Sequence, residues 1–387
     1  MRVFDISGCR AFCLGVVLLA SGYAQAFQDP TQVAAAKSKL MLLSPLTAVI
    51  NAGKRTIAVG QRGHIVVSDD GGQSWQQASV PVSSDLVAVS FAGDRHGWAV
   101  GHGGVVLHSA DGGLNWELQL EGKQASRLIL EYYSDKSRGG ALENAQMLLE
   151  REKILLSYGG TQPLMAVHFT DEKVGYVVGL FNRILKTVDG GKTWEPWQHR
   201  IDNPNELHFY SIGADAHALY ITGEQGMVWR LGKGEQGYVA RPTGYDGTLF
   251  GSVSNGKVLI AYGMRGSVYR SVDLGATWQR VDVGTQAGIT AGVYLEGGQF
   301  VLGSLAGEIA LSSNGAKTFD PVNLKKMMPF FGLASMPGND LMLVGAAGIQ
   351  REALVLKAPD GAASSVLVER IGNPHTTYVG AGHGRIN

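Results

Sequence analysis

The sequence is poor in cysteine, in charge and in long apolar runs. Its 387 residues contain two cysteines, Cys9 and Cys13. A chain with so few thiols cannot depend on a disulfide framework, so a large apolar core must hold the fold together. Charged residues make up 17% of the chain, against about 25% in typical globular proteins. With 45% hydrophobic residues, the composition excludes a disordered chain.

Other absences exclude whole classes of function. Because the formal net charge is zero, the composition gives no reason to expect a nucleic acid partner. After residue 26 no apolar run reaches about 18 residues, which argues against a protein with several membrane spans. None of the ten histidines forms H-E-x-x-H or another tight ligand spacing, so we expect neither a metal nor a cofactor. The 54 glycines favour an all-β fold of short strands and tight turns.

Residues 1–26 have the features of an export signal. Arg2 and Arg10 give a positive start, and Ala11–Ala20 is apolar but too short to span a bilayer. Ala24-Gln25-Ala26 then offers the small residues that signal peptidase needs. We expect cleavage after Ala26, loss of both cysteines, and a location in the bacterial periplasm. An uncleaved membrane anchor is the alternative.

A glycine-anchored unit recurs along the rest of the chain. It reads VGQRGHIVVS at 59–68, VGHGGVVLHS at 100–109 and YGMRGSVYRS at 262–271. The anchoring glycines, spaced by 41, 78, 44, 40, 40 and 42 residues, are Gly60, Gly101, Gly179, Gly223, Gly263, Gly303 and Gly345. A nearly constant period predicts seven supersecondary units, and the single long gap marks an insertion. Apolar runs such as LVAVSF (86–91) precede the glycines and predict strands buried on both faces.

A second motif follows four of these glycines. Its first copy is Ser68-x-Asp70-x-Gly72-x-Ser74-Trp75, and Asn314 lies in a degenerate fifth copy. The motif resembles the Asp-box, or BNR repeat, a β-hairpin turn. The carboxylate can accept local N–H bonds, the glycine supplies a positive φ, and the tryptophan packs on neighbouring strands. We interpret as structural, and not catalytic, the residues Asp70, Trp75, Asp111, Trp116, Asp189, Trp194, Asp273 and Trp278.

Seven units of four strands predict an all-β, seven-bladed β-propeller with Asp-box repeats, occupying residues 46–370. We name the strands of a unit A to D, with B ending at the anchoring glycine and the Asp-box between C and D. An N-terminal segment, 27–45, precedes the propeller, and we expect a flexible C-terminal tail at 371–387. The last blade is completed either by the segment near Lys37–Leu43 or by Ser364–Arg370.

The insertion, 121–160, falls between blades 2 and 3. Residues 140–160 have the apolar spacing of a helix, and 125–135 could form a second one. A lid on the propeller and an element that docks a partner are both compatible with this pattern.

Roughly residues 40 to 350 resemble the photosystem II stability and assembly factor family. The resemblance depends on the form V-G-x-x-G-x-V-x-x-S-x-D-G-G-x-x-W at 100–116 and on the run LMAVHFTDEKVGYVVG at 164–179. It implies a non-enzymatic propeller whose partner is a membrane protein or membrane-complex subunit, with no small-molecule substrate. Relatives in bacteria without photosystems include some beside RND-type exporter components. The expected cleavage leaves a mature chain without cysteine, which departs from the lipid-anchored cyanobacterial form and favours a non-photosynthetic relative.

A glycan-binding or sialidase-like propeller is the alternative function, because Asp-boxes also occur in sialidases. The Arg-Ile-Pro signature of that family is missing, and no Tyr and Glu pair can be assigned, so we expect no catalytic residues. Candidate partner-binding residues are the turn arginines Arg62, Arg265 and Arg183. Strand parity places the B–C turns and the insertion on one face, opposite the Asp-boxes.

Overall fold

The computed structural model describes residues 28–138, 140, 142–324 and 326–354. The described residues belong to one compact unit. The expected signal sequence, the C-terminal tail and the candidate closing strand Ser364–Arg370 lie outside the described residues.

The described strands form seven antiparallel sheets, each built in chain order from strand A outward. The A strands are β1 (Leu46–Ala52), β5 (Leu86–Ala92), β9 (Leu164–Phe169), β13 (Phe209–Ala214), β17 (Leu249–Ser254), β21 (Ile289–Tyr294) and β25 (Phe330–Ser335). The B strands are β2 (Arg55–Gly60), β6 (His96–Gly101), β10 (Gly175–Gly179), β14 (Ala218–Gly223), β18 (Leu259–Gly263), β22 (Phe300–Ser304) and β26 (Asp340–Gly345). The C strands are β3 (Ile65–Ser68), β7 (Val106–Ser109), β11 (Ile184–Thr187), β15 (Val228–Gly232), β19 (Val268–Ser271), β23 (Ile309–Ser312) and β27 (Gly348–Ala353). The D strands are β4 (Gln76–Gln77), β8 (Glu117–Leu120), β12 (Glu195–Pro196), β16 (Val239–Ala240), β20 (Gln279–Val281) and β24 (Asp320–Val322).

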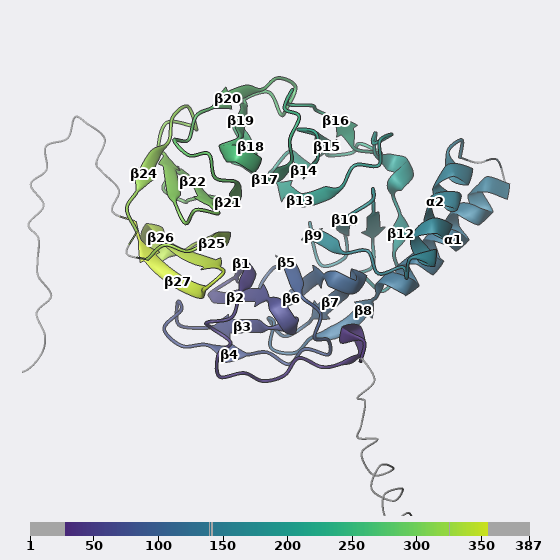
Figure 1. The fold of residues 1–387 in the computed structure, drawn as a ribbon, viewed down its shortest axis with the longest axis horizontal. Helices are drawn as coiled ribbons and strands as arrows, with labels where there is room; N and C mark the ends of the chain where they lie inside the picture. Colours follow the sequence, from purple (N-terminus) through teal and green to yellow (C-terminus); the bar gives the residue numbers. More distant parts are fainter. Residues whose placement is uncertain (1–27, 139, 141, 325, 355–387) are drawn as a thin grey trace, which may run out of the picture. The chain divides into compact units, whose positions relative to one another are not determined.

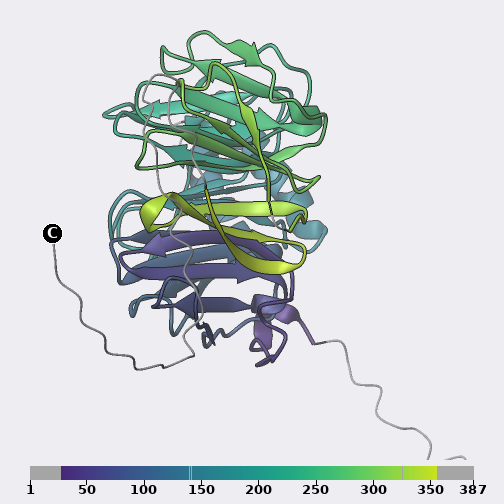
Figure 2. The same ribbon diagram turned by 90° about the vertical axis from the view of Figure 1, so that its left-hand side faces the viewer.

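The sheets follow one another around a closed ring. Each A strand contacts the A strand of the next sheet, and β25 contacts β1. Figures 1 and 2 both show the last sheet, in yellow, beside the first, in purple. The predicted seven-bladed propeller is therefore confirmed, with the insertion between blades 2 and 3.

The anchoring glycines are fixed by a close approach of two backbones. Gly101 and Gly263 have extended φ values of −176° and −173°, which any residue can adopt. A Cβ atom at these positions, however, would lie 2.0 Å from the carbonyl oxygens of Asp85 and Thr248 respectively, each just before an A strand. Because only glycine leaves room for that carbonyl, the anchoring glycine marks where the B strand passes the start of its own blade. The exception is Gly303, where a Cβ atom would meet only side chains, at 3.4 Å or more.

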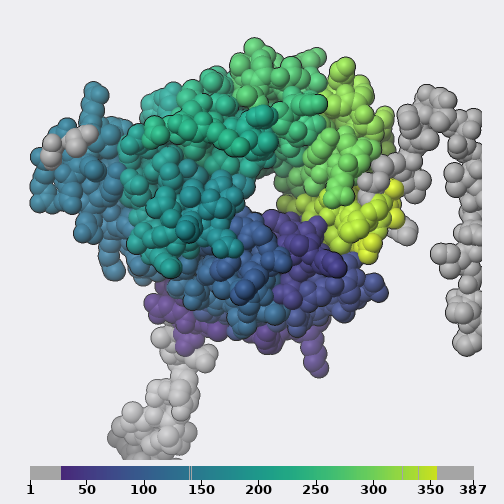
Figure 3. Space-filling view, turned by 180° about the vertical axis from the view of Figure 1, so that it is seen from behind, coloured from purple at the N-terminus to yellow at the C-terminus, as the bar shows by residue number. Residues whose placement is uncertain are grey.

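Burial differs from the sequence expectation in one respect. The residues of β2, β6 and β26 after the first are all buried, whereas Val87, Ala88 and Val89 of β5 are only half-buried. The prediction that the runs before the glycines are buried on both faces is wrong for β5. A strands are innermost, and Figure 3 shows an opening at the centre of the ring, so one side of these strands lacks a packed layer.

The last blade has three strands among the described residues. The segment Lys37–Leu43 does not form a fourth, because Leu40–Ser44 is a turn. The Leu42 carbonyl accepts one backbone hydrogen bond from Ile349 of β27, and Lys37 Nζ donates to the carbonyl oxygens of Gln77 and Ala78 in blade 1. This segment therefore ties blade 1 to blade 7 without completing the sheet.

The insertion contains two helices, α1 (Gly122–Arg138) and α2 (Ala145–Ser157). Both expected helices are present, and α1 begins three residues earlier than predicted because the Glu121 carboxylate accepts the N–H groups of Lys123 and Gln124. The buried side chains of both helices share one apolar cluster with blades 2 and 3. In the part of the chain that the structure describes, no helix combines the length and hydropathy needed to cross a bilayer.

Candidate functional site

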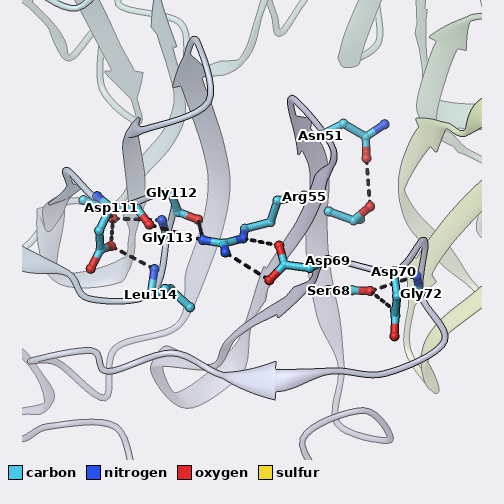
Figure 4. Close-up of polar contacts among 12 residues, drawn as sticks. Asn51, Arg55, Ser68, Asp69, Asp70, Gly72, Asp111, Gly112, Gly113 and Leu114 are labelled. Atoms are coloured by element: carbon cyan, nitrogen blue, oxygen red, sulfur yellow. Dashed lines mark hydrogen bonds and ion pairs between the residues drawn. The ribbon is translucent and has the colours of Figure 1, made fainter.

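Each Asp-box turn is built around one carboxylate. In the first copy, Asp70 Oδ1 accepts the backbone N–H groups of Gln73 and Ser74 at 2.9 Å, and Oδ2 accepts the Ser74 hydroxyl at 2.5 Å. The Ser68 hydroxyl donates to Asp70 Oδ1 and accepts the N–H of Gly72, both at 2.8 Å (Figure 4). Gly72 has a φ of +90°, in the left-handed region that favours glycine. Both carboxylate oxygens are thus engaged inside their own turn.

The other three copies repeat this geometry. Asp111, Asp189 and Asp273 each accept the backbone N–H of the residue four positions later, at 3.0, 2.9 and 2.9 Å. The following tryptophans pack inward: Trp116 and Trp194 are buried, and the Trp116 ring meets the edge of Phe91 at 6.1 Å between centroids. These contacts support the structural interpretation of the Asp-box residues.

The degenerate fifth copy shows what the motif requires. Asn314 Oδ1 accepts the N–H groups of Lys317 and Thr318, as an aspartate would. Its Nδ2 donates to the Thr318 hydroxyl at 2.8 Å. The side-chain hydrogen bond of the motif is therefore kept, but the hydroxyl is now the acceptor and not the donor. Ala316 adopts a φ of +59° at the position of the glycine. An amide therefore builds the same turn without a charge.

Hydrogen bonds hold the carboxylates in their ionised form. The Ser74 hydroxyl, the Ser74 N–H and the Ser68 hydroxyl lower the pKa of Asp70 well below its usual range. The pKa of Asp273 falls to about 2, chiefly because the Thr277 hydroxyl and N–H donate to it. A carboxyl group with such a pKa cannot serve as a general acid near neutral pH.

The Asp-boxes also receive bonds from the preceding blade. Arg55 in β2 clamps Asp69 through Nε and Nη2, at 2.6 and 3.0 Å, and its Nη1 donates to the carbonyl of Gly112 in the next box at 3.0 Å (Figure 4). The carbonyls at the corresponding position of three further boxes are bound in the same way from the blade before. Arg351 donates to Gly71, and Arg270 donates to Gly315. Trp98 and Gln119 both donate to Gly190. The motif signalled the turn but not this second role.

We call the face that carries these turns the box face, and the face with the B–C turns and the insertion the insertion face. The turns of Arg62 and Arg265 share the same backbone conformation. Both arginines have left-handed φ values, 55° and 56°, and both side chains are exposed. The residue before each of them donates its N–H to a carbonyl that precedes an A strand, Gln61 to Pro45 and Met264 to Thr248. The B–C turns thus lie with the D–A connections, as strand parity predicts.

The prediction that Arg183 binds a partner is wrong. Its side chain is 2% exposed, and Nη2 lies 2.8 Å from Oε1 of Glu152 in α2 and 3.2 Å from Oε1 of Gln162. A guanidinium buried between the insertion and blade 3 cannot reach a partner. Arg183 therefore fastens α2 to the propeller, because a buried charge needs a charged partner close by.

Sequence reasoning missed a second attachment of α2. Arg151 lies over the ring of Phe181, 5.7 Å from its centroid, and forms an ion pair with Glu206. Phe181 belongs to the B–C turn of blade 3, and Glu206 to the connection that leads into blade 4. No sequence motif signalled this attachment. These contacts place α2 on the insertion face.

Among the described residues, no group of three or more His, Cys, Asp or Glu side chains is arranged to hold a metal ion. A shallow, open depression of about 580 Å³ lies between the outer parts of blades 3 and 4, where its lining includes His199, Asp202 and Tyr238. None of the predicted site residues lines it.

Comparison with known proteins identifies a family. The model of the family described as photosynthesis system II assembly factor YCF48 matches residues 45–126 and 152–286, more than half of the chain. The unmatched interval between these ranges falls within the insertion. A search of curated proteins found no match.

Three solved structures are similar in fold. "YCF48 bound to D1 peptide" is 15% identical with a TM-score of 0.60, covering 85% of this chain and 98% of its own. "YCF48 from Cyanidioschyzon merolae" is 18% identical with a TM-score of 0.60, covering 81% and 96%. The WD40 β-propeller domain of Doa1 is 8% identical with a TM-score of 0.56, covering 83% and 95%.

Proposed function

Because the chain belongs to the photosynthesis system II assembly factor YCF48 family, we propose that it is a non-enzymatic propeller that binds a membrane-protein partner during assembly of the partner's complex. The insertion face is the binding surface. The box face is occupied by its own turns, since the carboxylates of Asp70 and Asp273 are engaged within them.

One observation carries this proposal: Arg62 and Arg265 are exposed in equivalent turns of the face that also holds α2. Neither guanidinium forms an ion pair with another described residue. A guanidinium presents a planar fork of donors that matches a carboxylate in two parallel hydrogen bonds. The surface therefore fits an acidic segment of a partner.

The kind of partner follows from the family. One solved relative is titled as bound to D1 peptide, which supports a peptide segment as the bound element here as well. The finer proposal is an RND-type exporter component in a non-photosynthetic bacterium. It is supported by the expected export signal in residues 1–26, which would deliver the protein to the periplasm.

The test is capture of membrane proteins from the native membranes with Arg62→Glu combined with Arg265→Glu. We expect the captured partner to fall on the order of tenfold, with less effect at high salt, because exposed charges are screened. The matched control is Lys173→Glu with Lys192→Glu, two exposed lysines on the box face. Equal loss in both variants, or in neither, would exclude the insertion face as the binding surface.

Deletion of the insertion is not a suitable test. The Ile129, Tyr133 and Leu148 side chains belong to one buried cluster with Trp98 and Phe169 of blades 2 and 3. Removing the helices would expose that cluster and leave the Arg183 guanidinium without Glu152, so lost binding would only report lost folding.

A further inference from the structure

Exposed apolar side chains gather along part of the insertion face. Five of them lie on blades 5, 6, 7 and 1, and all are more than 40% exposed. They are Leu40, Leu43, Met264, Leu305 and Met327. We call this set the apolar arc. Single exposed apolar residues need no explanation, but a group on one face marks an interaction surface.

Backbone contacts place the members of the apolar arc side by side. The turn with Leu40 and Leu43 lies against the B–C turn of blade 7, where Ile349 donates to the Leu42 carbonyl. Met327 is next to the B–C turn of blade 6, because a Cβ atom on Gly307 would lie 3.1 Å from its own Cβ.

The remaining two members continue the row. The Leu305 N–H donates to the carbonyl of Gly288, and a Cβ atom on Gly288 would lie near both Leu305 and the Gly263 carbonyl that precedes Met264. Met264, Leu305 and Met327 are therefore neighbours on blades 5 and 6, and the turn with Leu40 and Leu43 lies beyond them against blade 7.

Cations accompany these apolar side chains in the sequence. Lys39 precedes Leu40, Lys326 precedes Met327, and Arg265 follows Met264; all three cations are exposed. Arg62 adds a fourth at the blade 1 end. Among the described residues none of the four forms an ion pair.

Three acidic side chains near these turns are engaged locally, whereas Asp246, in the connection into blade 5, is exposed. Asp85 accepts the N–H of Arg62 at 2.8 Å, and Asp282 accepts the N–H of Gly284 at 2.9 Å. Glu308 accepts the Ser304 hydroxyl at 3.1 Å. The apolar arc therefore consists of exposed apolar side chains, and the lysines and arginines beside them form no ion pairs.

We propose that the apolar arc docks on the surface of an anionic lipid bilayer. Apolar side chains at the tips of separate turns enter the interface one by one, while adjacent lysines and arginines meet lipid phosphates. Arg62 and Arg265 belong both to this surface and to the proposed partner-binding surface, so the test below leaves both arginines unchanged.

The test is co-sedimentation of the purified protein with protein-free vesicles. One set contains phosphatidylcholine alone and the other phosphatidylcholine with phosphatidylglycerol. We expect binding to the anionic vesicles, and a loss on the order of tenfold when Met264, Leu305 and Met327 are all changed to Ser. The matched control is Val188→Ser with Val272→Ser, which removes apolar side chains that are 62% and 60% exposed in Asp-box turns.

The outcomes separate this proposal from the proposed function. Both variants have the same N-terminus, so any binding through it would be equal in both. Absence of preference for anionic vesicles, or equal binding by the two variants, would overturn the lipid proposal. If the triple variant instead lost capture of a membrane protein in detergent while vesicle binding was absent from the start, the arc would be a protein-binding surface. A double variant, Lys39→Gln with Lys326→Gln, should weaken anionic binding while its melting temperature stays unchanged.

Discussion

Arg351 in the last blade donates from Nη1 to the carbonyl oxygen of Gly71 in the first blade, at 3.0 Å and across 280 residues of sequence. The same guanidinium is held by Asp340, with Nε and Nη2 at 2.9 and 2.7 Å from Oδ2. This bond repeats between blades 7 and 1 the contact that Arg55 makes between blades 1 and 2. The first and last blades are thus joined by the same kind of arginine-to-carbonyl hydrogen bond that joins blades 1 and 2.

Removing that contact should weaken closure. Arg351→Ala is expected to lower the free energy of unfolding by about 1–2 kcal/mol, since the bond is charge-assisted but partly exposed. Urea unfolding measures the difference, with Arg280→Ala, an exposed arginine in β20, as the control. If Arg280→Ala lowers the free energy of unfolding as much as Arg351→Ala does, closure of the ring does not depend on Arg351.

The buried tryptophans should contribute more to stability than the carboxylates beside them. Trp116→Ala leaves a cavity next to Phe91 and should cost about 3–5 kcal/mol. Asp111→Ala leaves turn amides without an acceptor and should cost about 1–3 kcal/mol. Thermal unfolding compares the two variants. Trp278→Ala should cost less stability than Trp116→Ala, because the Trp278 ring is only half-buried. Unchanged melting in all three would contradict the packing described above.

The Asp-boxes make stability depend on pH in acid. Because the pKa of Asp273 is lowered to about 2 in the folded protein, its contribution is present above the ordinary value of 3.8 and is lost as pH falls through about 2. Asp273→Asn should imitate Asn314 and keep the turn, so its melting temperature should approach that of the unmodified protein as pH falls from about 7 to about 2. Glu131→Gln in α1 controls for general charge effects. A difference that stays constant across this range would refute the assignment.

Catalysis by the Asp-boxes is not expected. Purified protein should show no turnover of sialosides or of general glycosidase substrates, since the carboxylates are held in their own turns. Turnover that Asp189→Asn abolishes would reverse the functional proposal.

Export can be tested by intact mass. Protein recovered from the periplasm should begin at Phe27, as cleavage after Ala26 predicts. A mature species that retains Cys9 would exclude both the cleavage site and the expected loss of thiols.

The sequence by itself determined the features that depend on neighbours within a few residues. The bonds that build an Asp-box link Asp70 to residues at most four positions away, so a local motif is sufficient to specify them. The constant spacing of the glycines specified seven blades, and the parity of four strands specified which turns share a face. Both follow from counting along the chain.

Only the tertiary structure decided what depends on distant neighbours. Arg183 lies four residues after its anchoring glycine, and the equivalent His64 of blade 1 is buried too, but only the assembled fold supplies Glu152 of α2 as the partner of the Arg183 guanidinium. The half-buried A strands are set by the opening at the centre of the ring, and the bond from Arg351 to Gly71 exists only once the ring closes. A side chain's long-range partners are properties of the assembled ring, and no local pattern encodes them.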